Sequence, residues 1–239
     1  MLAITRPVPP SIERCELTHL AREPIDFARA TAQHTRYEAL LAELGCEVRP
    51  LPMRAELPDS VFVEDAAIVT DTIAVIARPG AASRRPEVDD VEAALRQYRD
   101  VVRIEAPGTL DGGDVLRVGD RWFVGRSGRT NDEGIRQLRR VIPAQPVDFR
   151  GCLHLKSAVT AVSEEMVVFN PEWVDPLWPC IPVDEPFAAN VLLLGGVVIA
   201  GRYPRTNARL RAAGIDVREV DAGELAKAEG GVTCCSLIV

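Results

Sequence analysis

Residues 115–124 are Val115-Leu116-Arg117-Val118-Gly119-Asp120-Arg121-Trp122-Phe123-Val124, two short apolar runs on either side of Gly119-Asp120-Arg121. Apolar runs that flank a turn containing glycine and aspartate predict a β-hairpin. A helical pattern over about 131–140 follows, and then a short apolar strand near 146–149. The local order is therefore strand, strand, helix, strand.

This order recurs about five times along the chain, and in the first unit the two termini divide it. One later unit has its helix weakened by prolines. The expected elements, in chain order, are strand 2–5, helix 26–44, strand 47–51, hairpin strands 66–69 and 73–77, helix 87–98, strand 101–105, hairpin strands 115–118 and 122–124, helix 131–140, strand 146–149, hairpin strands 159–162 and 166–169, hairpin strands 191–194 and 197–200, helix 205–213, strand 215–220 and strand 236–239.

Repeats of this size are typical of radial or linear repetition of one supersecondary unit. A closed ring would bring both termini together and leave a cavity at its centre. Because no low-complexity linker divides the chain, we expect one α/β domain over 1–239. A doubly wound α/β sheet is the alternative, but its neighbouring parallel strands need crossover connections, which the many hairpins do not provide.

The composition excludes several classes of protein. The 239 residues are 47% hydrophobic and 26% charged, with a net charge of −7, and they form no basic face for nucleic acid. The N-terminus has no signal-peptide pattern and the apolar runs are too short to span a membrane, so we expect a cytoplasmic protein. Its six cysteines should then be reduced thiols, and none stands in a CxxC spacing, so we expect no zinc site.

A thiol and an imidazole are candidates for chemistry. Cys234 stands in Thr233-Cys234-Cys235-Ser236, just after two glycines that allow the backbone to approach a ligand. In a strand, only one of Cys234 and Cys235 can face a given cavity. His154 lies at a strand entrance, whereas His34 is expected on a helix surface and His19 in a loop. Most free cysteines and lone histidines are structural, so residue type alone does not decide their roles.

Charged residues cluster at the expected hairpin ends. Glu64 and Asp65 precede an apolar strand, and adjacent carboxylates favour a cation between them. Asp111-Gly112-Gly113-Asp114 has the same character at another hairpin. Arg84 and Arg129 lie between hairpins and helices, where two arginines together can bind a carboxylate. A solvated strand end or a surface arginine is the simpler reading of each, but one ligand with a cation and a carboxylate, such as arginine or its derivatives, explains all of them.

The chain resembles dimethylarginine dimethylaminohydrolases, members of the guanidino-group-modifying enzyme superfamily. The resemblance runs through nearly the whole sequence, and its motifs are specific together although none is specific alone. They are residues 57–65 (LPDSVFVED), 78–85 (RPGAASRR), 109–115 (TLDGGDV), 129–131 (RTN), 153–157 (LHLKS) and 233–236 (TCCS). The family fold, a five-bladed α/β propeller (pentein) of ββαβ units around a central site, agrees with the repeat count.

The resemblance also implies residue roles. Cys234 matches the nucleophile, His154 the acid/base and Asp111 the carboxylate that orients the histidine. The substrate contacts that it implies are the guanidinium at Glu64 and Asp65, the α-amino group at Asp59, the α-carboxylate at Arg84 and Arg129, and backbone contacts from Leu17, on a lid over 7–23, and from Ala228. The chain is shorter than many relatives near 150–151 and over 163–176, and the first of these sites adjoins His154.

The implied reaction is hydrolysis of Nω-methylated L-arginine to L-citrulline and an alkylamine through a covalent cysteine intermediate, with no cofactor and no metal. The partner is a small-molecule substrate, and the family includes monomers and dimers, so a homodimer is one of two allowed states. Arginine deiminases typically carry an aspartate two residues after the histidine, where this chain has Lys156. The alternatives are an arginine deiminase or other guanidine-modifying enzyme, and a catalytically silent protein that binds methylarginine.

Overall fold

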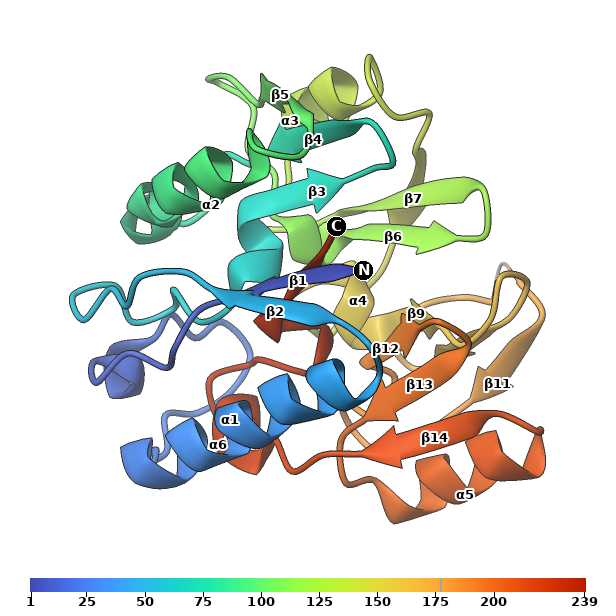
Figure 1. Ribbon diagram of the computed structural model, residues 1–239. Helices are drawn as coiled ribbons and strands as arrows, with labels where there is room; N and C mark the ends of the chain where they lie inside the picture. The colour runs from blue at the N-terminus through green and yellow to red at the C-terminus, as the bar shows by residue number, and fades with distance from the viewer. Residues whose placement is uncertain (177) are drawn as a thin grey trace.

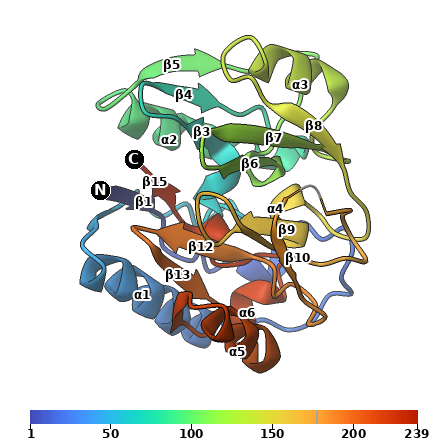
Figure 2. The same ribbon diagram turned by 90° about the vertical axis from the view of Figure 1, so that its right-hand side faces the viewer.

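The computed structural model describes residues 1–176 and 178–239. Within them, five three-stranded sheets stand around a common centre (Figure 1 and Figure 2). Residues 115–124 belong to one of them. Its strands β6 (Val115–Val118) and β7 (Arg121–Arg126) are antiparallel, and after helix α3 (Asp132–Leu138) strand β8 (Gln145–Asp148) pairs parallel to β7. The expected unit is confirmed.

Three other units follow the same plan, with the second strand always in the middle of the sheet. Their elements are β3 (Ala67–Val69), β4 (Ile73–Ile76), η3 (Ala82–Glu87), α2 (Val88–Leu95) and β5 (Asp100–Arg103); β9 (Val159–Ala161), β10 (Val167–Phe169) and β11 (Cys180–Pro182); and β12 (Val191–Leu194), β13 (Val197–Ala200), α5 (Pro204–Ala212) and β14 (Asp216–Glu219). The β9 unit is the one with prolines, and among its described residues no helix lies between β10 and β11.

The fifth unit joins the two ends of the chain. Strand β15 (Leu237–Ile238) pairs antiparallel with β1 (Leu2–Thr5), with Ala3 opposite Ile238. Helix α1 (Phe27–Glu43) then leads to β2 (Glu47–Pro50), which is parallel to β1. Both termini lie close together in Figure 1. The sheets therefore form a five-bladed propeller, and the expectation of a unit divided by the termini is confirmed.

Short helical turns stand at the inner ends of the blades, and the sequence pattern did not predict them. Each precedes the first strand of a blade: η2 (Val63–Ala66) before β3, η4 (Gly112–Asp114) before β6, α4 (Leu155–Ala158) before β9 and η5 (Thr233–Cys235) before β15. Turn η2 packs against η4 and η5, and η4 packs against α4. The remaining short elements are η1 (Ile12–Arg14) and α6 (Gly223–Ala226).

Apolar clusters fill the space between the sheets and the helices that cover them. In the β6 blade, Ile135 and Leu138 of α3 are buried in one cluster with Val124 of β7. Helix α1 buries a wider face than expected: His34, predicted on the helix surface, is only 3% exposed, on the same face as Ala30 and Tyr37. None of the helices in the described part of the chain is long and apolar enough to cross a membrane.

Helix α3 lies so close to the strand entrance of its blade that only glycine fits at position 134. A Cβ there would overlap the carbonyl oxygen of Thr109, two residues before Asp111. Gly→Ala inside a helix is normally stabilising, but here we expect Gly134→Ala to lower the free energy of unfolding by about 1–3 kcal/mol because of overpacking. Urea denaturation would measure this. Gly223→Ala, where a Cβ meets side-chain atoms of Asp221 at 3.3 Å and of Gln33 at 3.9 Å, is the matched control and should be near neutral. A stabilised Gly134→Ala would contradict the packing described.

Candidate active site

The inner ends of the five blades supply the polar side chains at the centre of the propeller. Turn η2 carries Asp65, Asp111 precedes η4, His154 precedes α4, Asn190 precedes β12 and η5 carries Cys234. All of them are buried, with exposures of 9% or less. Residues far apart in the sequence therefore meet because each stands at the same place in its own blade.

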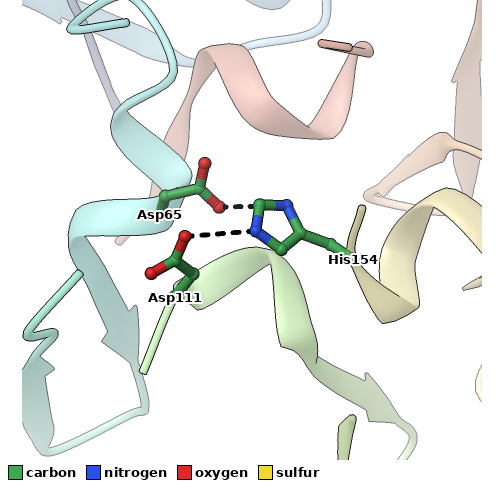
Figure 3. Close-up of side chains that lie close together, drawn as sticks. All are labelled: Asp65, Asp111 and His154. Atoms are coloured by element: carbon green, nitrogen blue, oxygen red, sulfur yellow. Dashed lines mark hydrogen bonds and ion pairs between the residues drawn. The ribbon is translucent and has the colours of Figure 1, made fainter. Parts of the chain in front are cut away.

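His154 lies between two carboxylates (Figure 3). Its Nε2 is 3.2 Å from Oδ2 of Asp111, and its Nδ1 is 3.6 Å from Oδ1 of Asp65. The side chain of Asp111 is in turn fixed by the backbone N–H of Gly80, which donates to its Oδ1 at 2.9 Å. The imidazole is thus held from both ring nitrogens, as an acid/base group must be if its orientation is to be constant.

These carboxylates set the protonation of the imidazole. Burial lowers the pKa of His154, but the charges of Asp65, Asp114 and Asp111 outweigh it and raise the pKa to about 9. His154 is therefore protonated at neutral pH. Since its pKa in the unfolded chain is about 6.5, this ionisation stabilises the fold fully below that pH, and the contribution is lost as pH rises through about 9.

Asp114 holds the backbone next to His154. Its Oδ1 accepts the N–H of Leu155 at 3.0 Å, and its Oδ2 accepts the hydroxyls of Ser127 and Thr130, each at 2.6 Å. Burial raises the pKa of Asp114 to about 6, against the opposing charge of His154. The sequence motif contains Asp114, but its role became visible only from these contacts.

Cys234 lines the same pocket as His154. Its Sγ accepts the N–H of Gly231 at 3.3 Å and lies 3.9 Å from the hydroxyl of Thr233. Burial, together with the charges of Glu64 and Asp65, raises the pKa of Cys234 to about 12, so the resting group is a thiol. A strand had been expected here, but Cys234 and Cys235 both belong to a helical turn. Of the two, only Cys234 lines this pocket.

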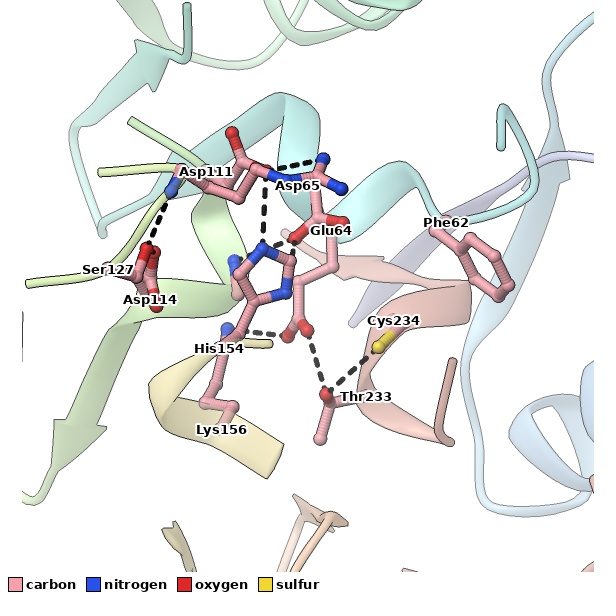
Figure 4. Close-up of polar contacts among 12 residues, drawn as sticks. Phe62, Glu64, Asp65, Asp111, Asp114, Ser127, His154, Lys156, Thr233 and Cys234 are labelled. Atoms are coloured by element: carbon pink, nitrogen blue, oxygen red, sulfur yellow. Dashed lines mark hydrogen bonds and ion pairs between the residues drawn. The ribbon is translucent and has the colours of Figure 1, made fainter. Parts of the chain in front are cut away.

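Glu64 is held inside a polar network (Figure 4). Lys156 donates to its Oε1 at 2.6 Å, and the hydroxyl of Thr233 donates to its Oε2 at 2.7 Å. Asn190 clamps the same turn: its side chain accepts the N–H of Thr233 at 3.1 Å and donates to the carbonyl of Lys156 at 3.1 Å. The segments that carry the thiol and the imidazole are therefore tied together. The sequence did not indicate Asn190, for which only the position before a blade's first strand could have been a signal, whereas Thr233 stands in the motif 233–236 but had no predicted role.

The two candidate arginines differ in their contacts. Arg84 is buried and donates to Oδ2 of Asp65 at 2.7 Å and to Oε2 of Glu87 at 2.9 Å. Burial raises the pKa of Glu87 to about 7, although Arg84 opposes this. Arg129 donates weakly to the hydroxyl of Thr18 at 3.4 Å, and its buried Nη1 has no hydrogen-bond partner among the described residues. Arg129 is therefore the arginine with a free donor.

A small pocket brings the predicted residues together. It has a volume of about 10 Å³, and its lining includes, among the predicted residues, Asp59, Asp65, Arg84, Arg129, His154, Ala228 and Cys234. Glu64 and Asp111 adjoin it through the contacts described above. Leu17, which the resemblance places on a lid, is half-buried and packs against the apolar cluster that contains Phe62, Ala228 and Cys234. The predicted residues thus converge on one place, and their roles stay predictions.

Asp65, Asp111 and His154 place three possible ligand atoms within 4.8 Å of one another. Charge argues against a cation among them, because Asp65 is already paired with Arg84 and Oδ2 of Asp111 lies 3.8 Å from Nη1 of Arg129. The arrangement suits a protonated imidazole better than a metal ion.

Known proteins are similar in sequence to this chain over nearly its full length, although no family model matches it. The chain is 41% identical over 248 residues to the N(G),N(G)-dimethylarginine dimethylaminohydrolase of Streptomyces coelicolor, covering 98% of this chain and 95% of that protein. It is 37% identical over 234 residues to the protein of the same name from Pseudomonas aeruginosa, covering 92% of this chain and 91% of that protein.

Solved structures share the fold. The dimethylarginine dimethylaminohydrolase of Pseudomonas aeruginosa, as a cysteine-to-serine variant with citrulline bound, has a TM-score of 0.91 at 35% identity, over 98% of this chain and 97% of that one. A histidine-to-glycine variant of a dimethylarginine dimethylaminohydrolase, with an S-methyl-L-thiocitrulline adduct, has a TM-score of 0.90 at 35% identity, over 98% of each chain. The N-terminal domain of ArgZ, an arginine dihydrolase, has a TM-score of 0.84 at 19% identity over 98% of this chain and 96% of that one, which extends the likeness in fold alone.

Asp65 has the largest raising effect on the pKa of His154. In Asp65→Asn we therefore expect that pKa to fall well below about 9, so that the imidazole loses its proton at a lower pH. An NMR titration of the imidazole carbon protons would measure it. The control is Asp148→Asn, which removes an exposed partner of Arg126 and should leave the titration unchanged. An unaltered pKa in Asp65→Asn would mean that the two carboxylates do not control the imidazole.

Proposed function

Since this chain belongs to the dimethylarginine dimethylaminohydrolase family, we propose that it hydrolyses Nω-methylated L-arginine to L-citrulline and dimethylamine or methylamine. The observation that carries the proposal is a buried imidazole, fixed between two carboxylates, in one pocket with a buried thiol. A nucleophile and an acid/base group at a cation-binding site are what the breaking of a guanidinium C–N bond requires.

Substrate charge supports the thiolate. The thiol of Cys234 has a pKa of about 12 because it is buried beside two carboxylates. A guanidinium bound at Asp65 would place a positive charge next to the sulfur, which favours loss of the thiol proton to solvent. The enzyme is thus activated by its own substrate, and the free thiol stays unreactive between turnovers.

The reaction then needs one proton donor that becomes an acceptor. The thiolate attacks the guanidinium carbon and forms an S–C bond. Protonated His154 gives its proton to the departing nitrogen, so that the C–N bond breaks and the amine leaves neutral, with an S-alkylthiouronium left on Cys234. Neutral His154 next takes a proton from water, whose oxygen attacks the same carbon, and the S–C bond breaks to release citrulline. A pKa of about 9 suits the first role, since the imidazole begins charged.

The contacts of Glu64 leave it able to bind the guanidinium side of the substrate. Lys156 and Thr233 each donate to one of its oxygens. Each carboxylate oxygen can accept a second hydrogen bond, so Glu64 is compatible with methylated and unmethylated guanidinium nitrogens.

The amino-acid end of the substrate would lie under the lid. Asp59 would hold the α-ammonium together with backbone groups of Leu17 and Ala228, and the free donor of Arg129 would bind the α-carboxylate. Arg84 would join Arg129 by exchanging Glu87 for the substrate carboxylate. The pKa of Glu87, near 7, makes this exchange easier, because protonation of Glu87 weakens its hold on Arg84.

We also propose that the enzyme works in the cytosol on its small-molecule substrate. All six cysteines are free thiols, which fits a reducing compartment.

Product analysis tests the function. We expect purified protein to release citrulline from asymmetric dimethylarginine and little from arginine, measured separately by a colorimetric citrulline assay. Citrulline mainly from arginine would assign the chain to the deiminases in spite of Lys156. Tight binding of methylarginine without any citrulline would support the silent binding protein instead.

Cysteine variants test the nucleophile. Cys234→Ser should lower turnover by at least about a thousandfold, because a serine hydroxyl loses its proton far less readily than a thiol and His154 begins the reaction protonated. Cys235→Ser should keep most of the activity, since the Sγ of Cys235 contacts the carbonyl of Gly231 and does not line the pocket. Mass spectrometry of the quenched wild-type protein should find the covalent adduct on the peptide of Cys234. Turnover by Cys234→Ser near that of the wild type would refute the assignment.

A further inference from the structure

The lid segment, residues 7–23, covers the pocket with the part that follows η1. Beyond η1 it has no helix or strand, and residues 16–22 are mostly exposed on their outer side. Glu16 lines the pocket beneath. With a volume of about 10 Å³, the pocket admits at most about one water molecule, so an arginine derivative can enter only when the lid segment moves away.

A single carboxylate binds three consecutive backbone amides of the lid segment. Glu229 is buried, with 8% exposure. Its Oε2 accepts the N–H of Thr18 at 3.0 Å, and its Oε1 accepts the N–H groups of His19 and Leu20, the latter at 2.7 Å. Hydrogen bonds to an ionised acceptor are stronger than neutral ones, and here three of them converge on one side chain. The side chains of Thr18 and His19 are exposed, so these backbone contacts hold that stretch where side-chain packing does not.

The backbone of Glu229 is adapted to this contact. Its φ is +58°, in the left-handed region that residues other than glycine rarely adopt. It directly follows Ala228, which lines the pocket, and stands two residues before Gly231, whose N–H contacts Sγ of Cys234. Glu229 therefore connects the lid segment to the loop that leads to the nucleophile.

Other contacts also join the lid segment to the site: Ser83 donates to Oε1 of Glu16, Leu17 packs against the apolar cluster, and two further hydrogen bonds involve residues that the substrate would use. Asp59 accepts the N–H of Glu16 at 3.1 Å, and Arg129 donates to Thr18 at 3.4 Å. A bound amino acid would compete for both of these side chains. Glu229 also lines the pocket, but no group of the substrate is assigned to it, so its three contacts with the lid segment need not be exchanged when the site is filled.

We propose that Glu229 is a positioning residue that latches the lid segment over the filled site. The latch itself follows from the contacts above, and its effect on turnover rests on the proposed function. Each turnover must break three hydrogen bonds to one side chain and form them again. The residue thereby acts on substrate capture and product release without touching the reacting atoms.

Hydrogen exchange tests the latch without any substrate. In the wild type, the amides of residues 18–20 should exchange together and more slowly than those of 21–23. In Glu229→Gln, which keeps the size but loses the charge, they should exchange about tenfold faster or more. The matched control is Glu224→Gln: Glu224 is also buried, five residues earlier, and accepts the N–H of Asp26, outside the lid segment.

Kinetics of the same variants test the consequence. With methylated arginine, Glu229→Gln should raise KM about tenfold and change kcat by less than about threefold, whereas Glu224→Gln should change neither. Three results would each overturn the latch. Amides 18–20 could be unprotected in the wild type, they could exchange at the wild-type rate in Glu229→Gln, or they could exchange as fast in Glu224→Gln as in Glu229→Gln. An inactive wild type with the expected exchange pattern would overturn the proposed function and leave the latch supported.

Discussion

Buried charges at the centre of the propeller must be paired, and this requirement organises the rest of the molecule. Arg84, Asp65 and His154 form a chain of alternating charges, and Asp111 closes it on the far side of the imidazole. A buried ion left without a partner would be strongly unfavourable, so each blade has to deliver its side chain to the right place. The same pairing gives the site its chemistry, because the carboxylates that pair with His154 also keep it protonated. One of them, Asp65, adds to burial and to Glu64 in raising the pKa of Cys234.

Much of the fold could be predicted because its signals are local. The hairpin 191–194 and 197–200 has the bounds of β12 and β13, since Gly195-Gly196 marks the turn between two apolar runs. The inner turns could not be predicted, because three or four residues are too few to show a helical period. What shapes them is distant in sequence, as where Asp114 accepts the N–H of Leu155. The prediction that His34 lies on the helix surface was wrong although the sequence contained the signal, because His34 has the helical spacing that places it on the same face of α1 as Ala30 and Tyr37.

The site was predictable as a set of residues and less so as a set of contacts. The order of the family motifs identified Cys234, His154 and Asp111, which the structure brings to one place. Their supporting partners come from other blades: Asn190 meets Thr233 across 43 positions, and Glu229 meets His19 across 210. Neither Asn190 nor Glu229 stands in a motif or on a periodic face. Such partners meet only because the ring closes, and no local sequence pattern predicts a contact of that kind.

The pairing of β1 with β15 has a consequence for how the protein is made. Strand β15 begins three residues after Cys234, and its partner is at the opposite end of the sequence. During synthesis, the blade that contains β1 can be complete only after residues 237–238 have left the ribosome. Because the turn that carries Cys234 lies just before β15, the proposed nucleophile is joined to this closing strand. We expect a chain that is truncated before β15 to lack the pairing that holds the two ends of the ring together.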